Sequence, residues 1–225
     1  MKYKGIIFDF NGVLLWDVAW HKEVWKTHGE KLRGAPLTEE ELTHKVMHHV
    51  NKEGFEFILG KEISKWESDK LTAEKEQEYR KLALTKGEEF ALSPGSVALL
   101  EKLILHNIPR TIATASEVTN VDFFFKQLHL AKWFNRKLVV FDDGKLPGKP
   151  HPAMYLKAAQ NLGLPPEECI AIDDSVTGLI SASAAGIGKV IALGNPETYT
   201  TLLLEKKITK VISDFREFSL QEFWE

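Results

Sequence analysis

Short, continuously apolar segments alternate with helical patterns along most of this chain. The first apolar run, Lys-Gly-Ile-Ile-Phe at 4–8, ends abruptly at Asp9, and similar runs recur from residue 110 onward. A strand that is buried on both faces of a parallel sheet has a continuously apolar sequence. Parallel strands are joined by long crossover segments, which are usually helical. The order of segments therefore predicts an α/β fold with a doubly wound parallel sheet. Predicted strands span 4–8, 110–114, 137–141, 169–172, 189–193 and 210–213, and predicted helices span 97–105, 120–128, 152–162, 177–185 and 197–205.

A helical segment interrupts this alternation after the first strand. From about residue 16 to residue 90 the sequence is rich in Glu, Lys, His and Leu at helical spacing, with few prolines. Such spacing is typical of amphipathic helices. We therefore expect two domains: an α/β core formed by residues 1–15 and 93–225, and an inserted helical domain formed by residues 16–92.

Charge and composition exclude several classes of protein. The chain has 29 basic and 32 acidic residues and a formal net charge of -3, so no overall field attracts it to nucleic acid or to a membrane surface. No segment approaches the roughly 18 apolar residues of a membrane span, and the N-terminus has no signal-peptide pattern. Cys169 is the only cysteine and cannot form an internal disulfide. We expect a packed cytoplasmic protein in which Cys169 is a buried, unreactive thiol.

Polar residues gather where the predicted strands end. Asp9 follows the first strand, Thr114 closes the second, Lys149 lies beyond the third, and Asp173 and Asp174 follow the fourth. Doubly wound sheets bind ligands at the carboxyl ends of their strands. Three carboxylates at one edge would repel one another, and Mg2+ with its shell of oxygen ligands is the obvious counter-ion. The hydroxyl of Thr114 and the ammonium of Lys149 then suit a bound anion, for which phosphate is the best candidate.

The order and content of these motifs resemble the haloacid dehalogenase superfamily, and in particular its β-phosphoglucomutase-like and phosphoglycolate-phosphatase-like branch. The resemblance covers essentially the whole chain and implies a Rossmann-like core with a mobile helical cap inserted after the first strand. It rests on Asp-Phe-Asn-Gly-Val at 9–13, Thr-Ala-Ser at 114–116, Gly-Lys-Pro-His-Pro at 148–152 and Asp-Asp-Ser-Val-Thr-Gly at 173–178.

The resemblance assigns roles to the motif residues. It implies that Asp9 is the nucleophile that accepts the phosphoryl group as an aspartyl phosphate. Thr114 and Lys149 would bind the phosphoryl oxygens. Mg2+ would be held by three groups: the Asp9 carboxylate, the backbone carbonyl of Asn11, and one or both of the carboxylates at 173 and 174.

Asn11 departs from the pattern of the family. The second aspartate of the first motif normally serves as general acid and base, and an amide cannot transfer that proton. Because such help is typically worth about 10² to 10⁴ in rate, we expect a slower catalyst unless another group substitutes. We favour an active phosphatase that carries a natural variant at this position. The alternatives are a phosphate-binding protein with little turnover, and deamidation at Asn11-Gly12 that creates a carboxylate.

Three residues of the helical domain are candidate substrate ligands. His21 lies at a spacing from Asp9 that resembles the cap histidine of β-phosphoglucomutase-like enzymes, and an ordinary surface histidine is the alternative. Asn51 and Lys52 fall where this branch places substrate-contacting residues, and a solvated charged face is the alternative.

Two residues of the core are further candidates. Ser116 and Glu117 follow Thr114 closely enough to contact a substrate, although Ser116 also suits the N-cap of the next helix. His44 and His48 have the spacing of a zinc pair, but no glutamate follows the first histidine and no third ligand is apparent, so we disfavour zinc.

Together these observations predict a Mg2+-dependent phosphatase that hydrolyses a small phosphomonoester, such as a sugar phosphate, through an aspartyl phosphate. The alternatives are a sugar phosphomutase of the β-phosphoglucomutase type, disfavoured by Asn11, and a phospholigand-binding protein. We expect a small phosphorylated metabolite as partner, with no nucleic acid and no membrane. A monomer is expected, and a dimer stays open.

Overall fold

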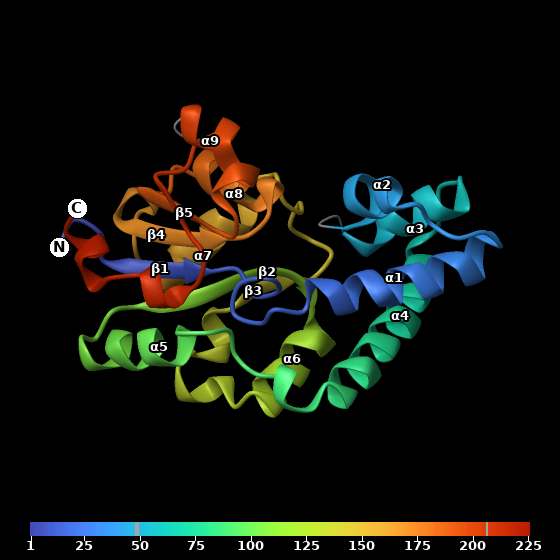
Figure 1. Cartoon of the computed structure of the whole chain (residues 1–225), viewed down its shortest axis with the longest axis horizontal. Coiled ribbons are helices and arrows are strands. Elements are labelled where there is room, and N and C mark those ends of the chain that lie inside the picture. Colours follow the sequence, from blue (N-terminus) through green and yellow to red (C-terminus); the bar gives the residue numbers. More distant parts are fainter. Residues whose placement is uncertain (48–49, 206) are drawn as a thin grey trace. The chain divides into compact units, whose positions relative to one another are not determined.

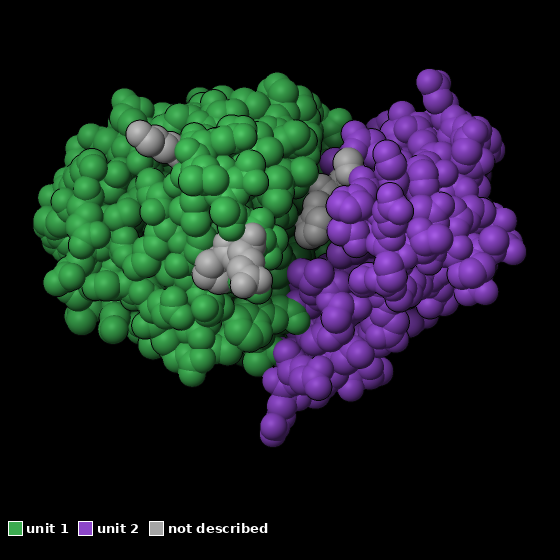
Figure 2. Space-filling view, turned by 45° about the horizontal axis from the view of Figure 1, so that its top comes forward, with its two compact units in different colours: residues 1–16, 91–225 green, residues 17–90 purple. Residues whose placement is uncertain are grey.

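A computed structural model describes residues 1–47, 50–205 and 207–225. The chain divides into two compact units, which Figure 2 shows in different colours. Unit 1 comprises Met1–Trp16 and Ala91–Glu225, and unit 2 comprises Asp17–Phe90. None of the helices in these described stretches combines the length and the apolar character that crossing a membrane requires.

Unit 1 is built on a parallel sheet whose strand order is β3-β2-β1-β4-β5-β6 (Figure 1). From β1 the chain adds β2 and then β3 on one side, and it then adds β4, β5 and β6 on the other side of β1. This is the doubly wound order, so the predicted α/β class is confirmed. The strands are β1 (Gly5–Phe8), β2 (Arg110–Glu117), β3 (Val140–Asp142), β4 (Cys169–Asp173), β5 (Lys189–Leu193) and β6 (Lys210–Ile212).

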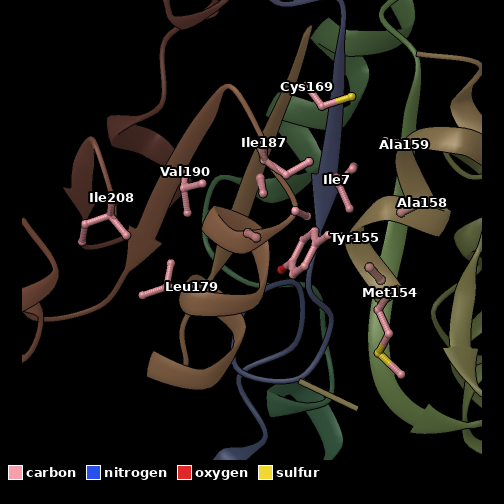
Figure 3. Packing of buried hydrophobic residues seen from close by; sticks show 14 of the residues in the cluster. Ile7, Met154, Tyr155, Ala158, Ala159, Cys169, Leu179, Ile187, Val190 and Ile208 are labelled. Carbon is pink, nitrogen blue, oxygen red and sulfur yellow. The ribbon is translucent and has the colours of Figure 1, made fainter. Parts of the chain in front are cut away.

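Helices cover both faces of this sheet. One face packs against α7 and α8 through a cluster that includes Ile7, Tyr155, Leu179 and Val190 (Figure 3). On the other face Phe8 meets other aromatic rings edge to face, because neighbouring residues of a strand point to opposite sides. The helices of unit 1 are α5 (Ser96–Leu105), α6 (Val118–Gln127), α7 (Ala153–Leu162), α8 (Val176–Ala184) and α9 (Thr200–Leu204).

Three predicted elements differ from the structure by three residues at one end, and the others by at most two. The third strand was predicted at 137–141, but the side chain of Asn135 accepts a hydrogen bond from Lys137 N–H and draws Arg136–Leu138 into a 3-10 turn ahead of β3. β2 continues beyond residue 114, because a register shift lets Glu117 pair with Asp142. The last predicted helix, at 197–205, begins as a 3-10 turn, Pro196–Tyr199, before α9.

Unit 2 is helical, as predicted for the insertion. Trp25, Leu42, Phe55, Ile58 and Leu71 pack in its core. Its helices are α1 (Val18–Arg33), α2 (Glu39–Glu41), a π-helical turn (Leu42–Val46), α3 (Asn51–Leu59), α4 (Lys65–Thr85) and a 3-10 turn (Gly87–Glu89).

Candidate active site

Strand register brings the predicted site residues of unit 1 to one edge of the sheet. Phe8 of β1 pairs with Ile172 of β4, so Asp9 and Asp173 leave the sheet side by side. Asp9 N–H donates to the carbonyl of Ile172 at 2.9 Å, which extends the ladder by one bond. On the other side of β1, Phe8 pairs with β2 at a position two residues before Thr114. The backbone thus sets the spacing of these side chains.

The three predicted carboxylates form one cluster. One oxygen from each of Asp9, Asp173 and Asp174 lies within 4.8 Å of the others, and Asp9 and Asp173 are buried. Two glycines make the room: a Cβ at Gly12 would lie 1.9 Å from Asp174 Oδ2, and a Cβ at Gly178 would lie 2.0 Å from Asp173 Oδ2. Only glycine fits either position, and Gly12 also has a φ of +82°.

The electrostatics of the cluster fit a divalent cation. Burial, together with the charges of Asp173 and Asp9, raises the pKa of Asp174 well above its usual range. The single positive charge of Lys149, which contacts Asp9 and Asp173, therefore does not balance all three carboxylates. A hard ion with oxygen ligands would supply the missing positive charge, so these residues suit Mg2+.

Lys149 is the cation within the cluster. Its Nζ donates to Asp9 Oδ1 at 2.5 Å and to Asp173 Oδ2 at 2.7 Å, and its side chain is only 6% exposed. Burial alone would lower the pKa of Lys149, but attraction to Asp173 and Asp9 outweighs that effect and raises the pKa above its ordinary value. Lys149 is therefore a permanent positive charge against Asp9.

Asp173 is held by donors that the sequence did not reveal. The hydroxyl of Tyr155 donates to Oδ2 at 2.6 Å, and the backbone N–H and the hydroxyl of Ser175 donate to Oδ1 at 2.9 and 2.8 Å. Burial opposes ionisation of Asp173, but Lys149 and these donors keep its pKa below the usual value. The sequence analysis contains Ser175 only as part of a motif and Tyr155 only as a residue of the predicted helix 152–162.

Asn11 lies beside two residues of β2. Ser116 Oγ donates to Asn11 Oδ1 at 2.5 Å, and Thr114 Oγ1 lies 3.5 Å from the same oxygen. Ser116 N–H donates in turn to Thr114 Oγ1 at 3.1 Å. The structure thus brings Asn11, Thr114 and Ser116 together at the edge that holds the carboxylates. The predicted N-cap alternative for Ser116 is wrong, because the side chain of Glu117 accepts from Thr119 N–H and caps α6.

The remaining predicted substrate ligands belong to unit 2. The ring of His21 stacks on Tyr79 at 4.0 Å, and its Nε2 lies 3.2 Å from Asp17 Oδ2, so His21 is not an ordinary surface histidine. Lys52 pairs with Glu56 at 3.4 Å and has a side chain that is half exposed. His44 lies in the π-helical turn, and the histidine at position 48, with which it was considered and disfavoured as a zinc pair, lies outside the described residues.

Asn51 belongs to a buried polar network that sequence analysis missed. Its amide donates to Glu76 at 2.9 Å and its oxygen accepts from Lys75 at 2.8 Å. Lys75 and Glu76 are both buried, and Lys75 Nζ also lies 4.3 Å from the centre of the Trp25 ring. Burial would raise the pKa of Glu76, but the charge of Lys75, together with the electrostatic interaction between Glu76 and His21, lowers it to about 2. A Lys-Glu pair in a strongly charged helix gives no sign of burial in the sequence.

Comparisons with known proteins identify the class of this chain. The sequence model of the haloacid dehalogenase-like hydrolases matches residues 3–186. The chain therefore belongs to that family, and the predicted enzyme class is confirmed. A family IA, variant 3 hydrolase of Entamoeba histolytica HM-1:IMSS superposes with a TM-score of 0.88 at 36% identity, over 98% of this chain and 97% of that one.

Curated relatives cover most of the chain. Hexitol phosphatase A of Escherichia coli (strain K12) is 29% identical over 87% of this chain and 85% of its own length. The β-phosphoglucomutase of Bacillus subtilis (strain 168) is 28% identical over 99% of this chain and 96% of its own length. The resemblance to the β-phosphoglucomutase-like branch is thus confirmed.

Proposed function

We propose that this protein is a Mg2+-dependent phosphatase that hydrolyses a small phosphomonoester through an aspartyl phosphate on Asp9. The observation that carries the proposal is the Asp9 carboxylate, held at the end of the central strand by Lys149 and flanked by Asp173. The phosphatase named among its relatives supports a sugar phosphate or a similar metabolite as substrate.

Two displacements complete the proposed reaction. First an oxygen of Asp9 attacks the phosphorus, the bond from phosphorus to the leaving oxygen breaks, and the electron pair stays on that oxygen, which takes a proton from solvent when the product is an alcohol. Then water attacks the aspartyl phosphate, the bond from phosphorus to Asp9 breaks, and inorganic phosphate leaves. The proton of that water passes to the phosphate or to solvent, and the carboxylate is restored.

Lys149 and Thr114 stabilise the transferring group in this proposal. Lys149 lies against the nucleophile and offsets the negative charge that would otherwise repel a phosphate dianion. Thr114 Oγ1 accepts from Ser116 N–H and donates over 3.5 Å to Asn11 Oδ1, and a phosphoryl oxygen would take its proton in place of that long hydrogen bond. Mg2+, held by Asp9, the Asn11 carbonyl, Asp173 and Asp174, would neutralise developing charge and align the attack when bound.

The helical unit acts as the cap in this proposal. His21, Asn51 and Lys52 are its proposed substrate ligands, with Ser116 and Glu117 from the core. Closure of a cap excludes water and adds selectivity. A phosphomutase is the second candidate, because the similarity to the β-phosphoglucomutase spans nearly the whole chain. A mutase must activate one sugar hydroxyl and release another, and Asn11 cannot exchange the protons that this requires.

The test is phosphate release from acyl, aryl and sugar phosphates with and without Mg2+. We expect turnover by the wild type, none by Asp9→Asn, and faster turnover by Asn11→Asp. Asp143→Asn is the matched control, because it makes the same change at an exposed aspartate of a turn and should leave the rate unchanged. Metal-dependent phosphate binding without turnover would contradict the phosphatase proposal and favour a phosphate-binding protein. A sugar monophosphate isomer as the product would favour the mutase.

A further inference from the structure

The amide of Asn11 is held in one orientation by a neighbouring serine. Ser116 Oγ donates to Asn11 Oδ1 at 2.5 Å, and Thr114 Oγ1 lies 3.5 Å from the same oxygen. An amide oxygen only accepts hydrogen bonds and an amide NH2 only donates them. With its oxygen engaged by Ser116, the other end of the Asn11 side chain can act toward any partner only as a donor.

The position of Ser116 is itself fixed. Ser116 lies near the end of β2, and its backbone N–H donates to Thr114 Oγ1 at 3.1 Å. The hydroxyl of Ser116 is therefore held over the residue that departs from the family's pattern. A donor in this place stabilises the amide oxygen of Asn11.

We infer that Ser116 is a positioning residue that fixes Asn11 as a hydrogen-bond donor to the leaving oxygen, so that the rate falls as the leaving group becomes more basic. This inference rests on the proposed function. Acyl phosphates and the phosphates of acidic phenols are the probes, because their leaving groups depart as anions. The bond from phosphorus to the leaving oxygen breaks as Asp9 bonds to phosphorus, and the leaving group keeps the electron pair as a carboxylate or phenolate. No proton is transferred from Asn11.

A series of aryl phosphates with phenols of increasing pKa, together with acetyl phosphate, tests the inference. For the wild type we expect kcat/KM to fall steeply as the pKa of the phenol rises. Ser116→Ala should lower kcat/KM about three- to tenfold for the least acidic phenols, which is the effect of one hydrogen bond, and much less for the most acidic. Ser116→Thr keeps the hydroxyl and should restore the wild-type slope. Ser219→Ala removes an exposed hydroxyl that caps a terminal turn, and should change nothing.

The double variant separates positioning from a structural role. In the Asn11→Leu background the amide is absent, so adding Ser116→Ala should lower the rate no further for any phenol. The effect of the same substitution thus disappears together with the amide, as positioning through Asn11 requires. Equal loss for every leaving group, or equal loss in both backgrounds, would overturn the inference while leaving the phosphatase standing. No phosphate release by the wild type from any substrate would overturn both.

Discussion

Replacing Lys149 by methionine tests the charge balance of the site. The substitution keeps the length of the side chain and removes a buried cation that contacts Asp9 and Asp173. Removing one partner of a buried ion pair typically costs 3–5 kcal/mol, because the other partner is left unpaired. Asp173 keeps its donors from Tyr155 and Ser175, so the lower end of that range, about 3 kcal/mol, applies.

The assay is thermal unfolding followed by circular dichroism, in EDTA and in saturating Mg2+. For a chain of this size about 3 kcal/mol corresponds to a fall in Tm of roughly 6–12 °C in EDTA. Mg2+ supplies positive charge to the same carboxylates, so it should recover at least half of the loss, although phosphatase activity should stay abolished. Lys145→Met, at an exposed lysine of the preceding loop, should change Tm by less than about 2 °C. An undiminished Tm in EDTA, or the same deficit with and without Mg2+, would refute the reasoning.

Two further predictions concern one residue of each unit. Gly12→Ala places a Cβ against Asp174 and should weaken Mg2+ binding at least about tenfold, as measured by isothermal titration calorimetry. Gly34→Ala is the control, because Gly34 has a similar positive φ with open space around it, and it should leave the Mg2+ affinity unchanged. Equal Mg2+ affinities of the two variants would show that the contact with Asp174 is unimportant. Glu76 has a pKa of about 2 when folded against 4.5 ordinarily, so its stabilisation is present above pH 4.5 and is lost as the pH falls from 4.5 to 2. Glu76→Gln should therefore lower the free energy of unfolding at neutral pH by about 3 kcal/mol, and urea titrations should show that this free energy depends less on pH below 4.5. Glu74→Gln, at an exposed site, should leave the pH dependence of the free energy of unfolding unchanged.

The part of the site that depends on the backbone could be predicted from the sequence. Asp9, Thr114 and Asp173 each lie at or near the carboxyl end of a continuously apolar strand, and parallel pairing brings such ends to one edge. The same pattern predicted the doubly wound sheet. The third strand was misplaced because a local cap at Asn135 competes with strand pairing.

The part of the site that depends on side-chain contacts could not be predicted. Tyr155 reaches Asp173 from α7, and its sequence neighbourhood looks like that of any buried helix face. Nothing in the sequence singles out Lys75 and Glu76, yet both are buried: Asn51 contacts both of them, and Trp25 contacts Lys75. Contacts between residues that are tens of positions apart leave no local pattern in a single sequence.

The charges of the site explain how Asn11 is compatible with this scaffold. Fully ionised, Asp9, Asp173 and Asp174 with Lys149 carry a net charge of two negatives, which one Mg2+ balances. An aspartate at position 11 would add a further negative charge beside a cluster that already raises the pKa of Asp174. The neutral amide avoids that repulsion and keeps a hydrogen-bond donor, but it gives up proton transfer. Under the proposed mechanism the site would therefore keep metal and phosphate binding, and its rate would depend on the leaving group.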